Sequence, residues 1–439
     1  MTFAIQTAAG LDETAVTFWS RAERVVVGVA LAVLTNALVG PLLAPNQGDV
    51  AEGAALRIIW LPVYGVAVAV SLLHAGRMRR VWPAALICAV LLAWPIASIV
   101  WSLDPDTTQR RCIALVFTTL FGLMLAARYS WRQLVTLLAG TFGVLALMSL
   151  VAGLLFPAWG INHTTNPNDW KGVWYEKNAM GANMALGGLA ALSAALIEPA
   201  RRRLWVSTLI LCAVLIVLSH SATSLLVLVL GGGIITALGL IRRGPVWAVA
   251  TAWIAVQGAG LIAATAWLAP ELLLKAIGKD PTLTGRTDIW ASILRRVQES
   301  PWLGYGYQAF WSIDRHGPAA IIRRETHWTV PSAHNGWLEL LIQLGALGVA
   351  LFALNYLLTV GTAVAGARRR PDGGFALVYL AVFGVFSLSE SYILQHNSIS
   401  WVLYVAVMAK VFERAPALVA GRVRAASGMA APALSGSGA

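Results

Sequence analysis

The residues best suited to chemistry are Arg286 and His334, which stand near the two ends of one long polar segment. Arg286 lies at or beside the first turn of an amphipathic helix predicted over residues 287–300, with Thr284 or Thr287 as its N-cap. The unpaired N–H groups and the dipole of a helix N-terminus favour an anion, and a guanidinium adds a bidentate donor for phosphate. The alternative interpretation is an ordinary exposed arginine.

His334 belongs to the motif SAHNGWLELL, directly before a long apolar run. An imidazole at this boundary, opposite a basic anion site, is suited to act as a general base. The alternative is a capping or interfacial polar residue. Glu339 follows about one turn into the apolar helix, where a carboxylate is costly and functional by default. We expect Glu339 to orient His334 or to pair with an outward arginine.

Other polar and aromatic residues near these two are candidates for binding a substrate. The cations that could share a phosphate with Arg286 are Lys177, Arg323 and Arg324. The side chains that could contact a sugar are Asn335, Trp290, Tyr305 and Tyr307. With 19 Trp in the chain, most indoles are expected to form interfacial belts instead. No CxxC motif or Cys/His cluster is present, so we expect neither a metal site nor a cofactor.

The composition identifies the kind of protein that must position these residues. Hydrophobic residues make up 58% of the chain and charged residues 12%, and the 439 residues include 40 Gly. Soluble domains contain about 45–50% apolar residues, glycine included, and about 25% charged residues. This balance excludes a soluble protein and a disordered one.

Apolar stretches of membrane-spanning length recur along the whole chain. They cover residues 25–45, 56–75, 82–101, 112–128, 133–156, 178–198, 204–219, 224–241, 246–269, 336–366, 374–394 and 397–413. The sequence therefore predicts an all-α polytopic membrane protein with about twelve transmembrane helices. The tenth stretch is long for one span, so it is expected to tilt or to project from the bilayer. We expect a single integral membrane domain over 1–424 and a disordered tail over 425–439.

Basic residues predict the orientation of this domain. If the N-terminus is cytoplasmic, 19 of the 32 Lys and Arg fall in cytoplasmic segments, as the positive-inside rule requires. Both termini then face the cytoplasm, and the net charge of +12 needs no nucleic-acid partner. Eight of the remaining basic residues lie in one outward loop over about 270–335. A loop of this length between closely connected spans is usually functional.

Five segments carry a family resemblance. They read SIVWSLDPDTTQRR (98–111), KGVWYEKNAMG (171–181), LSHSATSLL (218–226), LTGRTDIWASILRRVQESPWLGYGYQAFW (283–311) and AHNGWLELLIQLGALG (333–348). In this order they resemble the O-antigen ligase and polymerase superfamily, and most of all its ExoQ-like exopolysaccharide polymerases. The resemblance covers about residues 98–360, with GRTDIW and HNGWLE as its most specific parts.

The resemblance implies a metal-independent, inverting glycosyltransferase of the GT-C type in the bacterial inner membrane, with a large periplasmic catalytic loop. Such enzymes transfer an oligosaccharide from undecaprenyl pyrophosphate to a second lipid-linked glycan, or to the lipid A core in the ligases. His334 matches the catalytic histidine and Arg286 an arginine that engages the donor pyrophosphate. Ligases carry a second arginine near the turn where this chain has Ala222. Its role would fall to Lys177, Arg323 or Arg324.

Two alternatives to a polymerase remain open at this point. A ligase would transfer the glycan to lipid A core, whereas a polymerase extends exopolysaccharide or O-antigen and could work with a chain-length regulator. A polytopic transporter of lipids or glycans is the alternative from another class. It predicts ionisable residues near the bilayer midplane and broken helices in paired repeats, whereas the polar residues here gather on one side.

Overall fold

The structure is a computed structural model that describes residues 20–39, 54–163, 167–269, 271, 286–311, 317–327, 330–367 and 374–413. The predicted tail over 425–439 and Thr284 lie outside these residues. Helices dominate the described part, where the one β-bridge pairs Ile161 with Trp170. The predicted all-α class is confirmed for this part of the chain.

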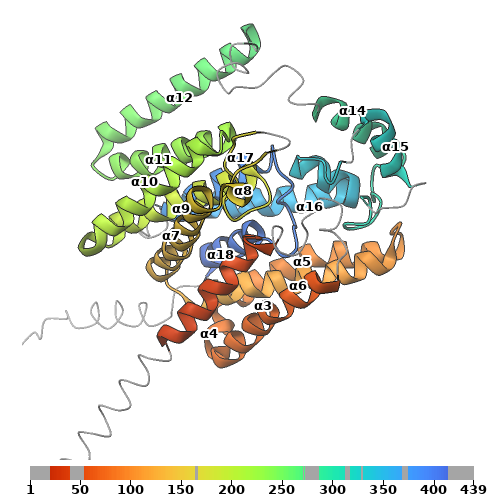
Figure 1. Ribbon diagram of the computed structural model, residues 1–439, viewed down its shortest axis with the longest axis horizontal. Helices are drawn as coiled ribbons and strands as arrows, with labels where there is room; N and C mark the ends of the chain where they lie inside the picture. Colours follow the sequence, from red (N-terminus) through yellow and green to blue (C-terminus); the bar gives the residue numbers. More distant parts are fainter. Residues whose placement is uncertain are drawn as a thin grey trace, which may run out of the picture.

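The long helices follow one another along the chain (Figure 1). After a helix over residues 20–34 come α3 (Ala54–Leu73), α5 (Trp82–Ala97), α6 (Pro105–Arg128), α7 (Trp131–Leu155), α9 (Lys177–Ile197), α10 (Arg202–Leu218), α11 (Ala222–Ile241), α12 (Pro245–Leu268), α16 (Gly336–Ala367), α17 (Gly374–Phe386) and α18 (Ile399–Phe412). Each of the twelve predicted apolar stretches overlaps one of these helices.

Within the described residues, seven helical segments are long and apolar enough to cross a membrane. They are Ala75–Val100, Pro105–Arg128, Trp131–Leu155, Lys177–Ile197, Ala222–Ile241, Pro245–Thr265 and Gly336–Ala367. Three shorter apolar helices accompany them: Ile58–Leu73, Gly374–Phe386 and Ile399–Phe412. The chain is therefore a multi-pass membrane protein, while the number of twelve spans stays a prediction.

Two helices form the centre of the bundle. In α9, 83% of the most apolar stretch of the helix is buried. This helix packs against α7, α10 and α11. The other central helix, α18, is buried from Ile399 to Lys410 and packs against α6. At the periphery, the most apolar stretch of α12 is 0% buried, as expected of a helix that faces lipid (Figure 1).

Glycines allow the central helices to approach closely, as the small-residue pattern predicts. A Cβ on Gly181 would lie 2.6 Å from Ser224 Oγ, and one on Gly187 would lie 2.6 Å from Phe142 Cβ. Gly233 differs from these two, because nothing lies within 4 Å of its Cβ position.

The helix α16 is broken, a feature that the length of the tenth apolar stretch did not predict. Gly345 has φ 64° and ψ −173°, so two helices meet at a kink. The segment 301–306 fills the break: Tyr305 N donates to Ile342 O over 3.0 Å, and Ala346 N donates to Pro301 O over 2.8 Å. Non-helical backbone at membrane depth is tolerated where protein satisfies it. The first part of α16 therefore belongs with the outward segment.

The connections predicted to face outward contact one another. Trp174, before α9, donates from Nε1 to Thr35 O over 2.9 Å. Leu103 N, between α5 and α6, donates to Tyr305 O over 3.0 Å. Segments far apart in the sequence therefore meet on one side of the bundle.

The connections predicted to face the cytoplasm also contact one another. Glu23 lies 2.6 Å from Arg128 Nε, and Glu198 lies 3.2 Å from Arg132 Nε. Both sets of contacts agree with the predicted alternation of the spans. Which set faces the cytoplasm stays a prediction.

The described part of the outward loop has a small core of its own. It contains α14 (Arg286–Val297) and α15 (Pro318–Thr326), which lie near the start of α16 (Figure 1). The buried members are Ile289, Ile293, Phe310, Ala319, Ile322, Val330, Ala333 and Ile342. The helix α14 ends at Val297 rather than at residue 300, and Leu294 of the predicted apolar stripe is 47% exposed.

Candidate functional site

Arg286 is the first residue of α14, as the sequence predicts. Thr287 is the second helical residue, so its prediction as N-cap is wrong. The Arg286 side chain is only 14% exposed. Its Nη1 donates to Ser389 O over 2.8 Å, and its Nη2 lies 3.7 Å from Glu390 Oε1. The guanidinium is therefore directed to the connection between α17 and α18.

His334 occupies a strained turn directly before α16. Its φ is 46°, in the left-handed region that costs a non-glycine residue about 1–2 kcal/mol. Its side chain is 16% exposed, and Nδ1 lies 3.7 Å from Glu390 Oε2. Gly336 N donates to Ser387 O over 2.8 Å and fixes the following backbone. Strain that the surroundings maintain is typical of a functional position.

Glu339 is buried beneath this turn and accepts hydrogen bonds from uncharged groups only. The donors are Trp311 Nε1 at 2.7 Å, Ala333 N at 2.6 Å, Ser391 Oγ at 3.3 Å and Gln343 Nε2. The expected pairing with an outward arginine is not found among the described residues, where neutral donors contact the carboxylate. The contact of Glu339 with the His334 turn is made through Ala333 N, the backbone of the preceding residue, and that Glu339 orients His334 stays a prediction.

Two carboxylates that the sequence analysis did not single out complete the site. Glu390 faces Arg286 with one oxygen and His334 with the other. Glu176 lies at the N-cap of α9, and its side chain is exposed at one side. The protein packed around its carboxyl displaces water and thereby raises the pKa of this group. Glu390 raises this pKa further, whereas His334 and Arg286 oppose the shift. Four ionisable side chains from three connections therefore share one electrostatic environment.

A signal for Glu390 was present in the sequence. The residue lies in the predicted span 374–394, where a carboxylate is costly and functional by default. The structure ends α17 at Phe386, so this predicted span was too long. Glu390 occupies the connection that follows.

The other predicted phosphate contacts do not gather at Arg286. Lys177 Nζ lies 2.6 Å from Asp169 Oδ2, and Asp169 Oδ1 also lies 2.7 Å from His220 Nδ1. Arg323, on α15, donates to Trp311 O over 3.2 Å, and Arg324 is exposed on the same helix. Lys177 therefore enters a separate cluster.

The predicted glycan contacts have structural partners. Asn335 Oδ1 accepts from the N–H groups of residues 337 and 338 over 3.0 and 3.2 Å, and so caps α16. Trp290 Nε1 donates to Ala333 O over 2.9 Å. Tyr305 donates from its hydroxyl to Glu299 Oε2 over 2.7 Å. All three side chains are half-buried.

Tyr307 cannot stack on a sugar, so its prediction as a glycan contact is wrong. It is 1% exposed, and its hydroxyl donates to Leu394 O over 2.6 Å. An aromatic ring with this burial is part of the core. Its function is to connect the outward segment with the residues before α18.

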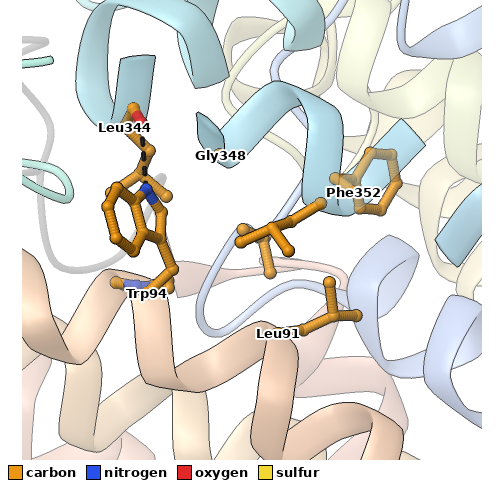
Figure 2. Close-up of a pocket in the computed structure, with 8 residues that line it drawn as sticks. Leu91, Trp94, Leu344, Gly348 and Phe352 are labelled. Atoms are coloured by element: carbon orange, nitrogen blue, oxygen red, sulfur yellow. Dashed lines mark hydrogen bonds between the residues drawn. The ribbon is translucent and has the colours of Figure 1, made fainter. Parts of the chain in front are cut away.

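A shallow apolar pocket, too small to enclose a water molecule, lies beside the kink in α16 (Figure 2). Its lining includes Leu91, Gly348 and Phe352, and Trp94 Nε1 donates to Leu344 O over 3.0 Å. A pocket of apolar side chains offers no group for acid–base chemistry or for phosphate. It is separate from the site around Glu390.

The fold and the site define a polytopic helical membrane protein with an ionisable cluster on one side. Within the described residues, no group of three or more His, Cys, Asp or Glu is placed to hold a metal ion. Acid–base and electrostatic chemistry by an imidazole, a guanidinium and two carboxylates is what this cluster offers.

Comparison with known proteins shows which family the chain is similar to. Residues 207–353, which include Arg286 and His334, match the family described as O-Antigen ligase. The chain is 28% identical over 271 residues to the exopolysaccharide production protein ExoQ of Rhizobium meliloti (strain 1021). This similarity covers 58% of the chain and 60% of the relative, so it spans less than two thirds of either. These matches confirm the resemblance to the O-antigen ligase and polymerase superfamily and to ExoQ.

Proposed function

We propose that the chain is an inverting, metal-independent glycosyltransferase. It transfers an oligosaccharide from undecaprenyl pyrophosphate to a second lipid-linked glycan and thereby polymerises exopolysaccharide or O-antigen repeat units. The observation that carries the proposal is the approach of Arg286 and His334 to the same carboxylate, Glu390. A phosphate-binding cation and a general base are the two groups that such a transfer requires.

In the proposed reaction, His334 accepts the proton of the acceptor hydroxyl. The hydroxyl oxygen attacks the anomeric carbon, and the bond from that carbon to the pyrophosphate breaks. The leaving pyrophosphate keeps the electron pair, and Arg286 at the start of α14 stabilises the growing charge. Because pyrophosphate is a good leaving group, the protein mainly has to position the two substrates.

The proposal includes a GT-C architecture, an inner-membrane location and a periplasmic site, with a chain-length regulator as a partner. A ligase that uses lipid A core as its acceptor is the nearest alternative. Polymerisation is favoured because the chain carries Ala222 where the ligases have an arginine and because the similar relative is an exopolysaccharide production protein. A transporter is disfavoured because the ionisable cluster lies in the connections between the long apolar helices.

Replacement of His334 tests the chemistry. We expect His334→Ala to reduce transfer by about 100-fold or more, the usual contribution of a general base, with normal insertion into the membrane. His163→Ala is a matched control, because His163 is exposed in another outward connection. Wild-type polymer output from His334→Ala would contradict the proposal.

A glycan profile of a deletion strain distinguishes the acceptors. We expect long exopolysaccharide or O-antigen chains to disappear and single repeat units to accumulate on the lipid carrier. An intact polymer that is missing only from lipid A would identify a ligase instead.

A further inference from the structure

Glu390 lies where it can interact with either of two groups. Its Oε1 is 3.7 Å from Arg286 Nη2, and its Oε2 is 3.7 Å from His334 Nδ1. Both separations exceed the usual N–H···O distance of about 2.7–3.2 Å. A shift of the carboxylate by roughly 1 Å would therefore complete one hydrogen bond and lengthen the other contact.

Hydrogen bonds hold the backbone around Glu390 in place. The shift would therefore be a movement of the Glu390 side chain alone. Glu390 N donates to Phe386 O over 2.7 Å, and Ser389 O accepts from Arg286 Nη1 over 2.8 Å. Ser391 Oγ donates to Glu339 over 3.3 Å. The short segment 387–391 thus contacts the start of α14, the His334 turn and the buried carboxylate beneath it.

Charge in the site decides which partner Glu390 takes. Without an anion, Arg286 attracts the carboxylate, and Glu176 adds a second carboxylate to the same environment. A bound pyrophosphate would take over Arg286 and add negative charge next to Glu390. Like charges that share a site repel each other, so the carboxylate would move from Arg286 toward His334.

The donor-free arrangement shields the base. Both ring nitrogens of His334 are buried, with less than 1 Å² of accessible surface each. An acceptor hydroxyl can reach Nε2 only after groups around the imidazole have moved.

We infer that Glu390 is a positioning residue that couples donor binding to the general base, an inference that rests on the proposed function. Without donor it neutralises Arg286. With pyrophosphate on Arg286, its carboxylate accepts from Nδ1–H of His334 and fixes the tautomer in which Nε2 accepts the proton. Acceptor activation therefore waits until the donor is in place.

The test compares binding and turnover in the full-length protein in liposomes. Binding is measured with undecaprenyl pyrophosphate without a glycan. Turnover is measured with lipid-linked oligosaccharide extracted from a strain that lacks the gene. We expect Glu390→Gln to lower kcat by about 100-fold or more. The same change should leave the binding of undecaprenyl pyrophosphate unchanged or up to about fivefold tighter, because Arg286 loses a competing carboxylate.

Two further variants separate positioning from a purely structural role. Glu390→Asp keeps the charge on a shorter side chain and should recover part of kcat. In an Arg286→Ala background, Glu390→Gln should no longer tighten binding, because Glu390 and the pyrophosphate no longer compete for Arg286. Glu325→Gln is the control, since Glu325 is an exposed partner of Arg295 outside the site and should behave as wild type.

The outcomes are distinguishable. A kcat of Glu390→Gln within threefold of wild type would overturn the inference, as would loss of undecaprenyl pyrophosphate binding in this variant. If Glu390→Gln does not fold, Glu390→Asp decides: wild-type kcat contradicts the coupling, and an intermediate kcat with intact binding supports it. Failure of the proposed function gives another pattern, in which the wild-type protein itself transfers no glycan.

Discussion

The break in α16 depends on one glycine, and Gly345→Ala is the sharpest test of the architecture. At φ 64° and ψ −173°, Gly345 occupies a backbone region that is almost closed to other residues. A Cβ at this position would overlap with the backbone of Trp302 and Leu303, which cannot move away like a flexible side chain. The substitution therefore strains both the helix and the segment 301–306 that fills the break.

The expected magnitude follows from these two effects. The unfavourable backbone conformation costs about 1–3 kcal/mol, and overpacking costs about 1–3 kcal/mol more. A loss of about 2–6 kcal/mol consumes a large part of the stability of a protein domain. Because Glu339 and the turn of His334 belong to the first part of α16, we also expect polymer production to fall steeply.

Gly361→Ala is the matched control in the same helix. Nothing lies within 4 Å of the Cβ position of Gly361, and the residue is helical. Alanine there should change stability by about 1 kcal/mol or less, in the favourable direction. Melting of the two detergent-solubilised variants, followed by size-exclusion chromatography after heating, compares them directly. Equal melting temperatures would refute the account of the broken helix.

Three further predictions concern the site and its surroundings. Arg286→Lys should impair donor binding nearly as much as Arg286→Ala, because lysine lacks the planar guanidinium that binds two phosphate oxygens. Activity equal to wild type would show that the phosphate lies elsewhere. Arg295→Ala, on the exposed part of α14, is the control. Tyr307→Phe should destabilise the protein by about 1–3 kcal/mol by leaving Leu394 O without its donor, whereas a specific loss of substrate affinity at unchanged stability would restore its role as a glycan contact. Transfer should continue in EDTA, because the described residues contain no group of acidic, His or Cys side chains placed for a metal; a requirement for added divalent metal would contradict this.

Local patterns in the sequence were sufficient to predict the apolar helices. Apolar length locates the spans, and amphipathic periodicity places Arg286 at the start of a helix, where the structure has it. Periodicity cannot show the break at Gly345, because an apolar run reads in the same way whether its helix is straight or kinked. It also cannot separate a buried aromatic anchor such as Tyr307 from an exposed platform.

Convergence of distant segments was the part that local patterns could not supply. Glu390 lies more than 50 residues after His334 and more than 100 after Arg286. The packing of α14 and α17 against α16 brings these connections together. The bilayer limits the possibilities, because alternating spans put every second connection on the same side. Within that side, helix packing selects which connections meet, and the carboxylate of Glu390 then gives the two predicted residues a common partner.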